Sequence, residues 1–164
     1  IVYVPRFDYI QGRIQSFFDR ETGTHNFQSD KAIDSITSGG FFGKGIGEGT
    51  LKNRVPEAHT DYIISVISEE FGVVAIMLIL LLFLIFIYMV FKKISFETND
   101  RIKLILIGSI SLILMQATIH IGVNIRLFPT TGMTLPFLSY GGSSIISTSI
   151  LAGIILNLTK RRIN

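Results

Sequence analysis

Several polar side chains with the chemistry of acids, bases or ligands lie around the start of the most apolar stretch of the chain. They are Glu57, His59, Thr60, Asp61, Glu69 and Glu70. A carboxylate at the entrance to an apolar segment is costly unless it is paired or used. Two readings are open. In one, Asp61 caps a helix while Glu69 and Glu70 pair with basic residues elsewhere; in the other, Asp61 is an outward-facing base.

The spacing of these residues argues against a tight metal centre. Glu57, His59 and Asp61 stand at i, i+2 and i+4, so at most Glu57 and Asp61 share one helical face. His120 lies in an apolar segment, where a hydrogen-bonded core or interface histidine is a more frequent case than a ligand. The chain contains no Cys, which removes thiolate metal sites and a cysteine nucleophile. No Ser-His-Asp arrangement fits the spacing.

A glycine-rich segment precedes the acidic residues. Six of the 15 glycines fall between Gly39 and Gly49, a density that indicates a shaped loop with close backbone approach. The phosphate-binding Walker pattern fails, because Ser38 stands where its first Gly belongs and Gly45 where Ser or Thr should follow Lys44. The dinucleotide pattern fails at Glu48. A structural turn and a loop that contacts an anion through Lys44 both remain open.

The elements that must position these residues are membrane helices and the loops between them. Of the 164 residues, 48% are hydrophobic and 16% charged, the mean hydropathy is +0.52, and Arg126 is the one charged residue between Leu104 and Thr159. The net charge of +3 does not indicate nucleic-acid binding, because the basic residues form no patch with interleaved aromatics. No signal-peptide pattern opens the sequence, which begins with Ile, and we expect a piece of a longer protein.

Uncharged runs predict three transmembrane helices. Phe71–Phe91 has 21 uncharged residues, enough to span a hydrocarbon core of about 30 Å. Leu104–Ile125 is also uncharged but carries polar residues that need partners inside a bundle. The third run, Ser143–Leu158, is extended by the uncharged residues before it. We expect helices at about 62–92, 103–126 and 142–159.

Basic residues predict the orientation of these helices. The loop between the first two contains Lys92, Lys93, Arg101 and Lys103, and Lys160, Arg161 and Arg162 follow the third. Both groups mark the cytoplasmic side. Residues 1–61 and the loop 127–142 then lie on the outer face. Within the first of these we expect an amphipathic helix over residues 10–18 and a short helix over Phe27–Thr37, ended by Gly39 and Gly40.

The second outer loop, within Leu127–Ser144, contains prolines and glycines but no charge. Irregular uncharged backbone at membrane depth needs protein or a wet cavity to cover it. We expect this loop to line a cavity beside the glycine-rich loop; a tight connection packed on its neighbours is the alternative.

Three segments together resemble one family, the SEDS (shape, elongation, division and sporulation) membrane glycosyltransferases. They are Phe27–Gly49, Pro56–Gly72 and Gly122–Ser144, and their order, spacing and membrane placement all agree with it. Gly47–Lys52 and Thr131–Phe137 resemble the division branch, FtsW, more than the elongation branch, RodA. The resemblance implies an all-α polytopic membrane fold of about ten helices, of which this chain holds roughly the last three and the large outer loop before them.

The resemblance also implies an activity, the polymerisation of lipid II into glycan strands for septal cell-wall synthesis. The family's essential aspartate falls on Asp61, for which we hypothesise the role of general base. Cationic help for the leaving pyrophosphate would come from Lys44, or from a weakly held Mg²⁺ or Mn²⁺ at Asp61 and Glu57. Further substrate-binding candidates are Gln28, Ser29, Glu57, Thr131, Ser139 and Tyr140. For Thr131, Ser139 and Tyr140, a role in structural packing is an equal alternative.

The implied partners are a class B penicillin-binding transpeptidase and other membrane proteins of the division machinery, and the implied location is the bacterial inner membrane at the septum. Two other functions compete with the polymerase. Broken helices and cavity-lining loops also occur in transporters, such as a flippase for a lipid-linked precursor. A scaffold of the division machinery would use the apolar loops as interfaces, and would tolerate replacement of Asp61 and Lys44.

Overall fold

The computed structural model describes residues 24–54 and 58–160, and all regular secondary structure in those residues is helical. The helices are α2 (Thr24–Gly39), α3 (Leu51–Arg54), α4 (Ile63–Phe96), α5 (Asp100–Asn124) and α6 (Gly142–Thr159). This confirms the predicted all-α class. The amphipathic helix predicted over residues 10–18 lies outside the described residues.

Three helices, α4, α5 and α6, are long and apolar enough to cross a membrane, as the sequence predicts. Of the most apolar 18-residue stretch of each helix, 33% is buried in α5, 6% in α4 and 11% in α6. Helix α5 is therefore the central one of the three. The side chain of Asn99 caps α5 by accepting from the backbone N of Arg101 at 3.0 Å. With this cap the second helix begins three residues before its predicted start.

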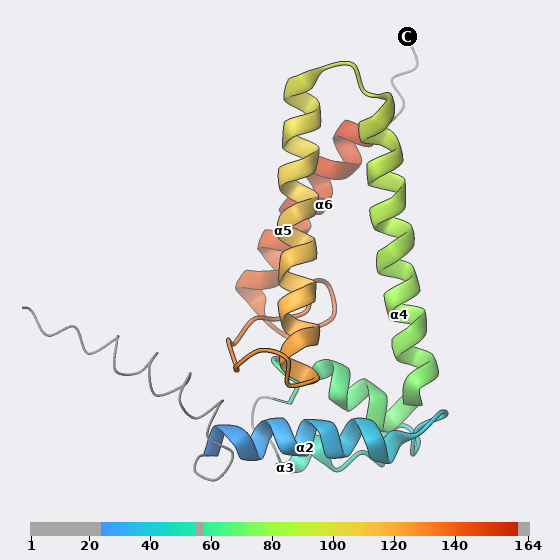
Figure 1. Ribbon diagram of the computed structural model, residues 1–164, viewed down its shortest axis with the longest axis vertical. Helices are drawn as coiled ribbons and strands as arrows, with labels where there is room; N and C mark the ends of the chain where they lie inside the picture. The colour runs from blue at the N-terminus through green and yellow to red at the C-terminus, as the bar shows by residue number, and fades with distance from the viewer. Residues whose placement is uncertain (1–23, 55–57, 161–164) are drawn as a thin grey trace, which may run out of the picture.

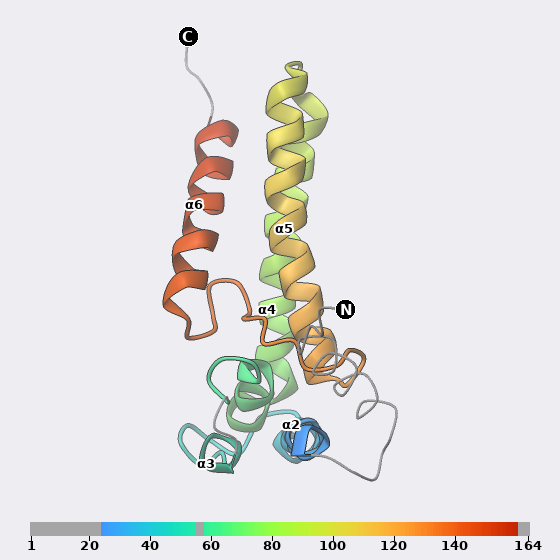
Figure 2. The same cartoon turned by 90° about the vertical axis from the view of Figure 1, so that its left-hand side faces the viewer.

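The described parts of the segments that the charge pattern assigns to the outer face, residues 24–54, 58–61 and 127–142, gather at one end of the three long helices. Figures 1 and 2 show α2 and α3 at that end, together with the connection between α5 and α6. The short connection between α4 and α5 lies at the opposite end (Figure 1). The helix predicted over Phe27–Thr37 is present as α2, which begins three residues earlier and ends at Gly39.

Helix α4 consists of two arms that meet at Gly72. The backbone of Gly72 has φ 77° and ψ −176°, which is not helical, and the two arms point in different directions (Figure 1). A Cβ atom on Gly72 would lie 2.2 Å from the carbonyl oxygen of Phe41. The break therefore brings the glycine-rich loop into direct backbone contact with α4, which only glycine allows at this position.

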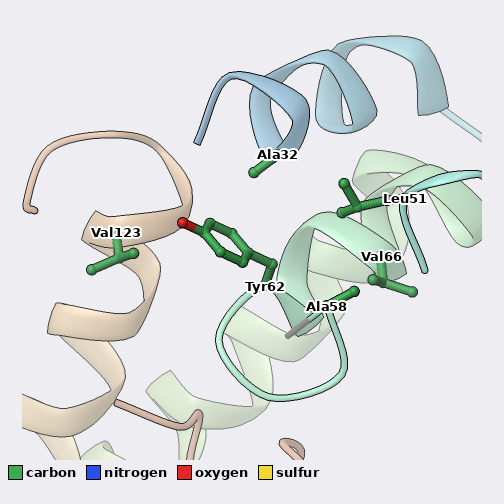
Figure 3. Packing of buried hydrophobic residues seen from close by; sticks show 6 residues of the cluster. All are labelled: Ala32, Leu51, Ala58, Tyr62, Val66 and Val123. Carbon is green, nitrogen blue, oxygen red and sulfur yellow. The ribbon is translucent and has the colours of Figure 1, made fainter. Parts of the chain in front are cut away.

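A small hydrophobic core holds this end together around Tyr62, whose side chain is 1% exposed. Figure 3 shows its ring between Ala32 of α2 and Val123 of α5. The other members of the cluster are Leu51, Ala58 and Val66. Because it draws on α2, α3, α4 and α5, this cluster fixes the position of the turn that ends at Tyr62.

Candidate active site

The turn over residues 58–62 is held by its backbone carbonyl groups, four of which in succession accept hydrogen bonds. The carbonyl of His59 accepts from the backbone N of Tyr140 at 3.1 Å, and that of Thr60 from Ser139 Oγ at 2.7 Å. The carbonyl of Asp61 accepts from Asn124 Nδ2 at 2.9 Å, and that of Tyr62 from the backbone N of Val66 at 3.1 Å. Two distant segments, residues 139–140 and the end of α5, thus hold one short turn, and the fourth bond is the first turn of α4 itself.

The side chain of Asp61 is half-buried at the start of α4. The N-cap of α4 is Tyr62, so Asp61 precedes the cap instead of forming it. Its Oδ2 atom lies 3.7 Å from the position that a Cβ atom on Gly132 would occupy. The carboxylate therefore faces the connection between α5 and α6, near a helix N-terminus whose dipole favours a negative charge.

The connection between α5 and α6 is held in place by polar side chains of α5. Gln116 Nε2 donates to the carbonyl oxygen of Thr134 at 3.0 Å and to Ser144 Oγ at 3.2 Å. His120, which is fully buried, bonds through Nδ1 to the carbonyl oxygen of Met133 at 2.8 Å. Gln116, His120 and Asn124 thus find partners, as expected of polar residues in this helix, and His120 is a hydrogen-bonded core residue.

The same connection lines two hollows, as its lack of charge predicts. One, of about 320 Å³, is lined by Gly132, Met133 and Thr134 with polar residues of α5 and α6, Gln116, Ser143, Ser144 and Ser147. The other, also about 320 Å³, is apolar and is lined by Pro136, Phe137 and Leu138 with residues of α4. The hydrogen bonds of the connection reach α5, the turn 58–62 and Ser144 of α6. That it lies beside the glycine-rich loop stays a prediction.

The glycine-rich loop packs on α4 at the junction of its two arms. The backbone N of Lys44 donates to the carbonyl of Glu69 at 2.8 Å, and that of Val73 to the carbonyl of Gly40 at 3.0 Å. A Cβ atom on Gly43 would lie 2.2 Å from the carbonyl oxygen of Glu70. These contacts favour the structural reading of the loop, because its glycines are needed for close backbone approach.

Glu69 is a buried carboxylate that ties this loop to α4. It is 1% exposed, and its Oε1 accepts from Lys44 Nζ at 2.9 Å and from Thr50 Oγ1 at 3.1 Å. Its Oε2 accepts from the backbone N of Leu51 at 3.0 Å. The expectation that Glu69 finds a basic partner is confirmed. Contact of Lys44 with a substrate stays a prediction, and its ammonium group is engaged by Glu69 here.

The remaining predicted binding residues fall in different surroundings. Ser29 is buried on α2, with its Oγ 3.4 Å from the hydroxyl of Tyr62, and Gln28 beside it is half-buried. Ser139 is 3% exposed, and its hydroxyl joins Thr60 to the backbone N of Leu135, a packing role. Thr131 and Tyr140 are exposed. Substrate contact by any of them remains a prediction.

The predicted divalent-cation site rests on Asp61 and Glu57, and Glu57 lies outside the described residues. Among residues 24–54 and 58–160, no three His, Cys, Asp or Glu side chains gather as a metal site. A weakly held cation at Asp61 and Glu57 stays a prediction.

Sequence reasoning did not single out Asn124, although it contacts the turn that carries Asp61. A signal was present in the spacing. Gln116, His120 and Asn124 stand at i, i+4 and i+8 in the uncharged part of the helix, so they lie along one face. In the structure this stripe holds both the connection to α6 and the turn before α4.

Comparison with protein families gives one match over the whole chain. The family described as "Cell cycle protein", with FtsW, RodA and SpoVE as its namesakes, matches residues 1–164. This confirms the resemblance drawn from the three sequence segments.

Two curated relatives are each named "Probable peptidoglycan glycosyltransferase FtsW". The protein from Caulobacter vibrioides is 39% identical over 95% of this chain and 40% of its own length. The protein from Enterococcus hirae is 38% identical over 89% of this chain and 39% of its own length. The chain thus spans about two fifths of the length of these relatives.

A solved structure shares the fold. It is described as "Structural coordination of polymerization and crosslinking by a peptidoglycan synthase complex". One of its chains superimposes with a TM-score of 0.70 and 28% sequence identity, over 92% of this chain and 41% of that chain. The arrangement of helices described above is therefore shared with a member of such a complex.

Proposed function

Because the chain belongs to the FtsW/RodA/SpoVE family of cell cycle proteins, we propose that it carries the catalytic aspartate of a peptidoglycan glycosyltransferase. The proposed reaction is the polymerisation of lipid II into glycan strands during septal wall synthesis. The observation that carries the assignment is the turn 58–62, where Asp61 projects toward Gly132 from a backbone held by four successive hydrogen bonds. Such fixation is what a positioned catalytic group requires.

The chemistry needs one base. Lipid II is an α-linked glycosyl pyrophosphate on a polyprenol, and the product bond is β, so one inverting displacement at the anomeric carbon is sufficient. Asp61 takes the proton of the acceptor sugar's 4-hydroxyl as that oxygen bonds to the anomeric carbon. The bond from the anomeric carbon to the pyrophosphate breaks in the same step, and the pyrophosphate leaves with the electron pair. A general base of this kind contributes a factor of about 10² to 10⁴.

Charge compensation for the leaving pyrophosphate is the second requirement. Lys44 remains one proposed source, although its bond to Glu69 means that it would have to serve both groups or exchange one for the other. A weakly held Mg²⁺ or Mn²⁺ at Asp61 and Glu57 remains the other proposed source.

The proposed setting is the inner membrane at the division site, with α2, α3 and the two loops on the outer face. A class B penicillin-binding transpeptidase is the proposed partner. In support, the solved structure with the same fold belongs to a peptidoglycan synthase complex. The three apolar helices support the membrane setting.

The test is lipid II polymerisation by the full-length protein with its cognate transpeptidase at matched membrane levels. Asp61→Asn removes the base, and Asp100→Asn is the matched control, since that side chain is 91% exposed at the opposite end of the bundle. We expect Asp61→Asn to lower the rate at least about 100-fold and Asp100→Asn to match wild type. The same assay with EDTA or with added Mg²⁺ measures whether the polymerisation rate depends on a divalent cation.

If glycan strands persist unchanged in Asp61→Asn, Asp61 is not the base. Transport of a lipid-linked precursor would then be examined by following translocation, and scaffolding by following assembly of the complex.

A further inference from the structure

Asn124 is the last residue of α5, and its side chain is completely buried. Its Nδ2 donates to the carbonyl oxygens of Asp61 and His120, each at 2.9 Å. Its Oδ1 accepts from Ser65 Oγ at 2.7 Å and from the backbone N of Ser65 at 3.3 Å. Both amide hydrogens and both acceptor positions of the side chain are used, so the amide has one orientation available.

This amide joins two helices at the point where the chemistry is proposed. The carbonyl carbon of Asp61 is bonded to the Cα atom from which the side chain projects, so holding that carbonyl also limits the direction of the side chain. Ser65 lies one turn further along α4, and its two bonds to Oδ1 fix the start of that helix. Asn124 thus sets the position of the Asp61 turn relative to α5.

The same helix also positions the other side of the site. One turn before Asn124, His120 binds the carbonyl oxygen of Met133, the residue after Gly132. Asp61 Oδ2 lies 3.7 Å from a Cβ position on Gly132. α5 therefore holds both segments whose approach places the carboxylate, through Asn124 on one side and His120 on the other.

On these observations we propose that Asn124 is a positioning residue for Asp61. The inference rests on the proposed function, because it concerns the base of that reaction. Asparagine suits the position, since it both donates to two carbonyls and accepts from Ser65. An aspartate would set a carboxylate oxygen against the carbonyls of Asp61 and His120, and an apolar side chain would leave buried polar groups unpaired.

The test compares Asn124→Asp, nearly the same size, with wild type in the full-length protein with its transpeptidase. Ser65→Ala is a graded variant, because it removes one donor to Oδ1 and leaves the bond from Nδ2 to Asp61. Ser109→Ala is the control, since Ser109 is buried on the same helix, 6% exposed, and remote from the turn. We expect Asn124→Asp to lower kcat about 10- to 100-fold with little change in KM for lipid II. Ser65→Ala should lower kcat less, and Ser109→Ala should match wild type.

Two readouts separate positioning from general destabilisation. Hydrogen exchange followed by mass spectrometry should show faster exchange in residues 58–66 of Asn124→Asp, with α6 unchanged. In a double-mutant cycle, Asn124→Asp should have a much smaller effect on kcat when Asp61 is already replaced by Glu, because it acts through Asp61.

The inference is overturned if Asn124→Asp keeps wild-type kcat, or lowers it by the same factor in both backgrounds. It is also overturned if exchange in residues 58–66 does not change. Should Asn124→Asp fail to accumulate in the membrane, Ser65→Ala is measured against the same criteria. If wild type itself forms no glycan strands, the proposed function has failed instead, and the exchange experiment alone decides whether Asn124 holds the turn.

Discussion

The ammonium group of Lys44 lies 2.9 Å from Oε1 of Glu69, a carboxylate that is 1% exposed, across 25 residues of sequence. The pair joins the glycine-rich loop to the first arm of α4. A buried carboxylate requires a counter-charge or several donors, and Glu69 has both. Lys44 therefore has a structural role, independent of any contact with a substrate.

Replacing Lys44 by Met should destabilise the fold by about 1–3 kcal/mol, because Glu69 keeps two neutral donors but loses its cation. Because the lysine side chain is 36% exposed and screened by solvent, we expect a cost toward the low end of this range. Thermal unfolding in detergent measures it. Lys103→Met is the control, since its partner Asp100 is 91% exposed, and adding Glu69→Gln to Lys44→Met should restore part of the loss. A single variant as stable as wild type would contradict the structural role.

Gly72→Ala should abolish accumulation of folded protein. The residue has φ 77°, and the new Cβ atom would lie 2.2 Å from the carbonyl oxygen of Phe41. Backbone on both sides of this contact must move, at a cost of about 4 kcal/mol or more. Gly108→Ala is the matched control, because it adds a methyl group in open space within helix α5. It should be neutral or stabilise by up to about 1 kcal/mol. Yields and unfolding midpoints that are equal for the two variants would refute the account of the break in α4.

Gly132→Ala should lower polymerisation more than stability. Because Gly132 has φ 69°, alanine there lowers the free energy of unfolding by about 1–2 kcal/mol. The new methyl group would lie 3.7 Å from Oδ2 of Asp61, where the acceptor sugar must approach. We expect kcat to fall about tenfold at matched protein levels. Gly142→Ala, which adds a methyl group to open space in the same region, should not reproduce this. Equal activities of the two variants would show that Gly132 does not border the reacting groups.

Ser139→Ala tests whether this residue packs or binds. The variant leaves the carbonyl of Thr60 and the buried N–H of Leu135 without their partner, at a cost of about 1–3 kcal/mol. The unfolding midpoint should drop, whereas KM for lipid II should stay close to wild type. Ser95→Ala, which removes an exposed hydroxyl from α4, is the comparison and should change neither. A raised KM with an unchanged unfolding midpoint would indicate instead that Ser139 binds the substrate directly.

Much of the fold could be predicted from the sequence, because a membrane-spanning helix requires a continuous run of uncharged, mostly apolar residues. An uncharged run such as Phe71–Phe91 has few alternatives to a membrane-spanning helix, since its backbone must satisfy its own hydrogen bonds in lipid. The polar residues of α5 could likewise be predicted to need partners. The spacing of Gln116, His120 and Asn124 carries the further information that they share one face, but not which groups they bind.

The sequence by itself determined the three long helices, the glycine-rich loop and a carboxylate at the start of α4, because each depends on local composition. Only the tertiary structure decided that Lys44 meets Glu69, and that α4 breaks at Gly72. The same holds for the carbonyls of Thr60 and Asp61, which are held by side chains 79 and 63 residues away. These contacts form between segments that are distant in the sequence, so no local sequence pattern predicts them.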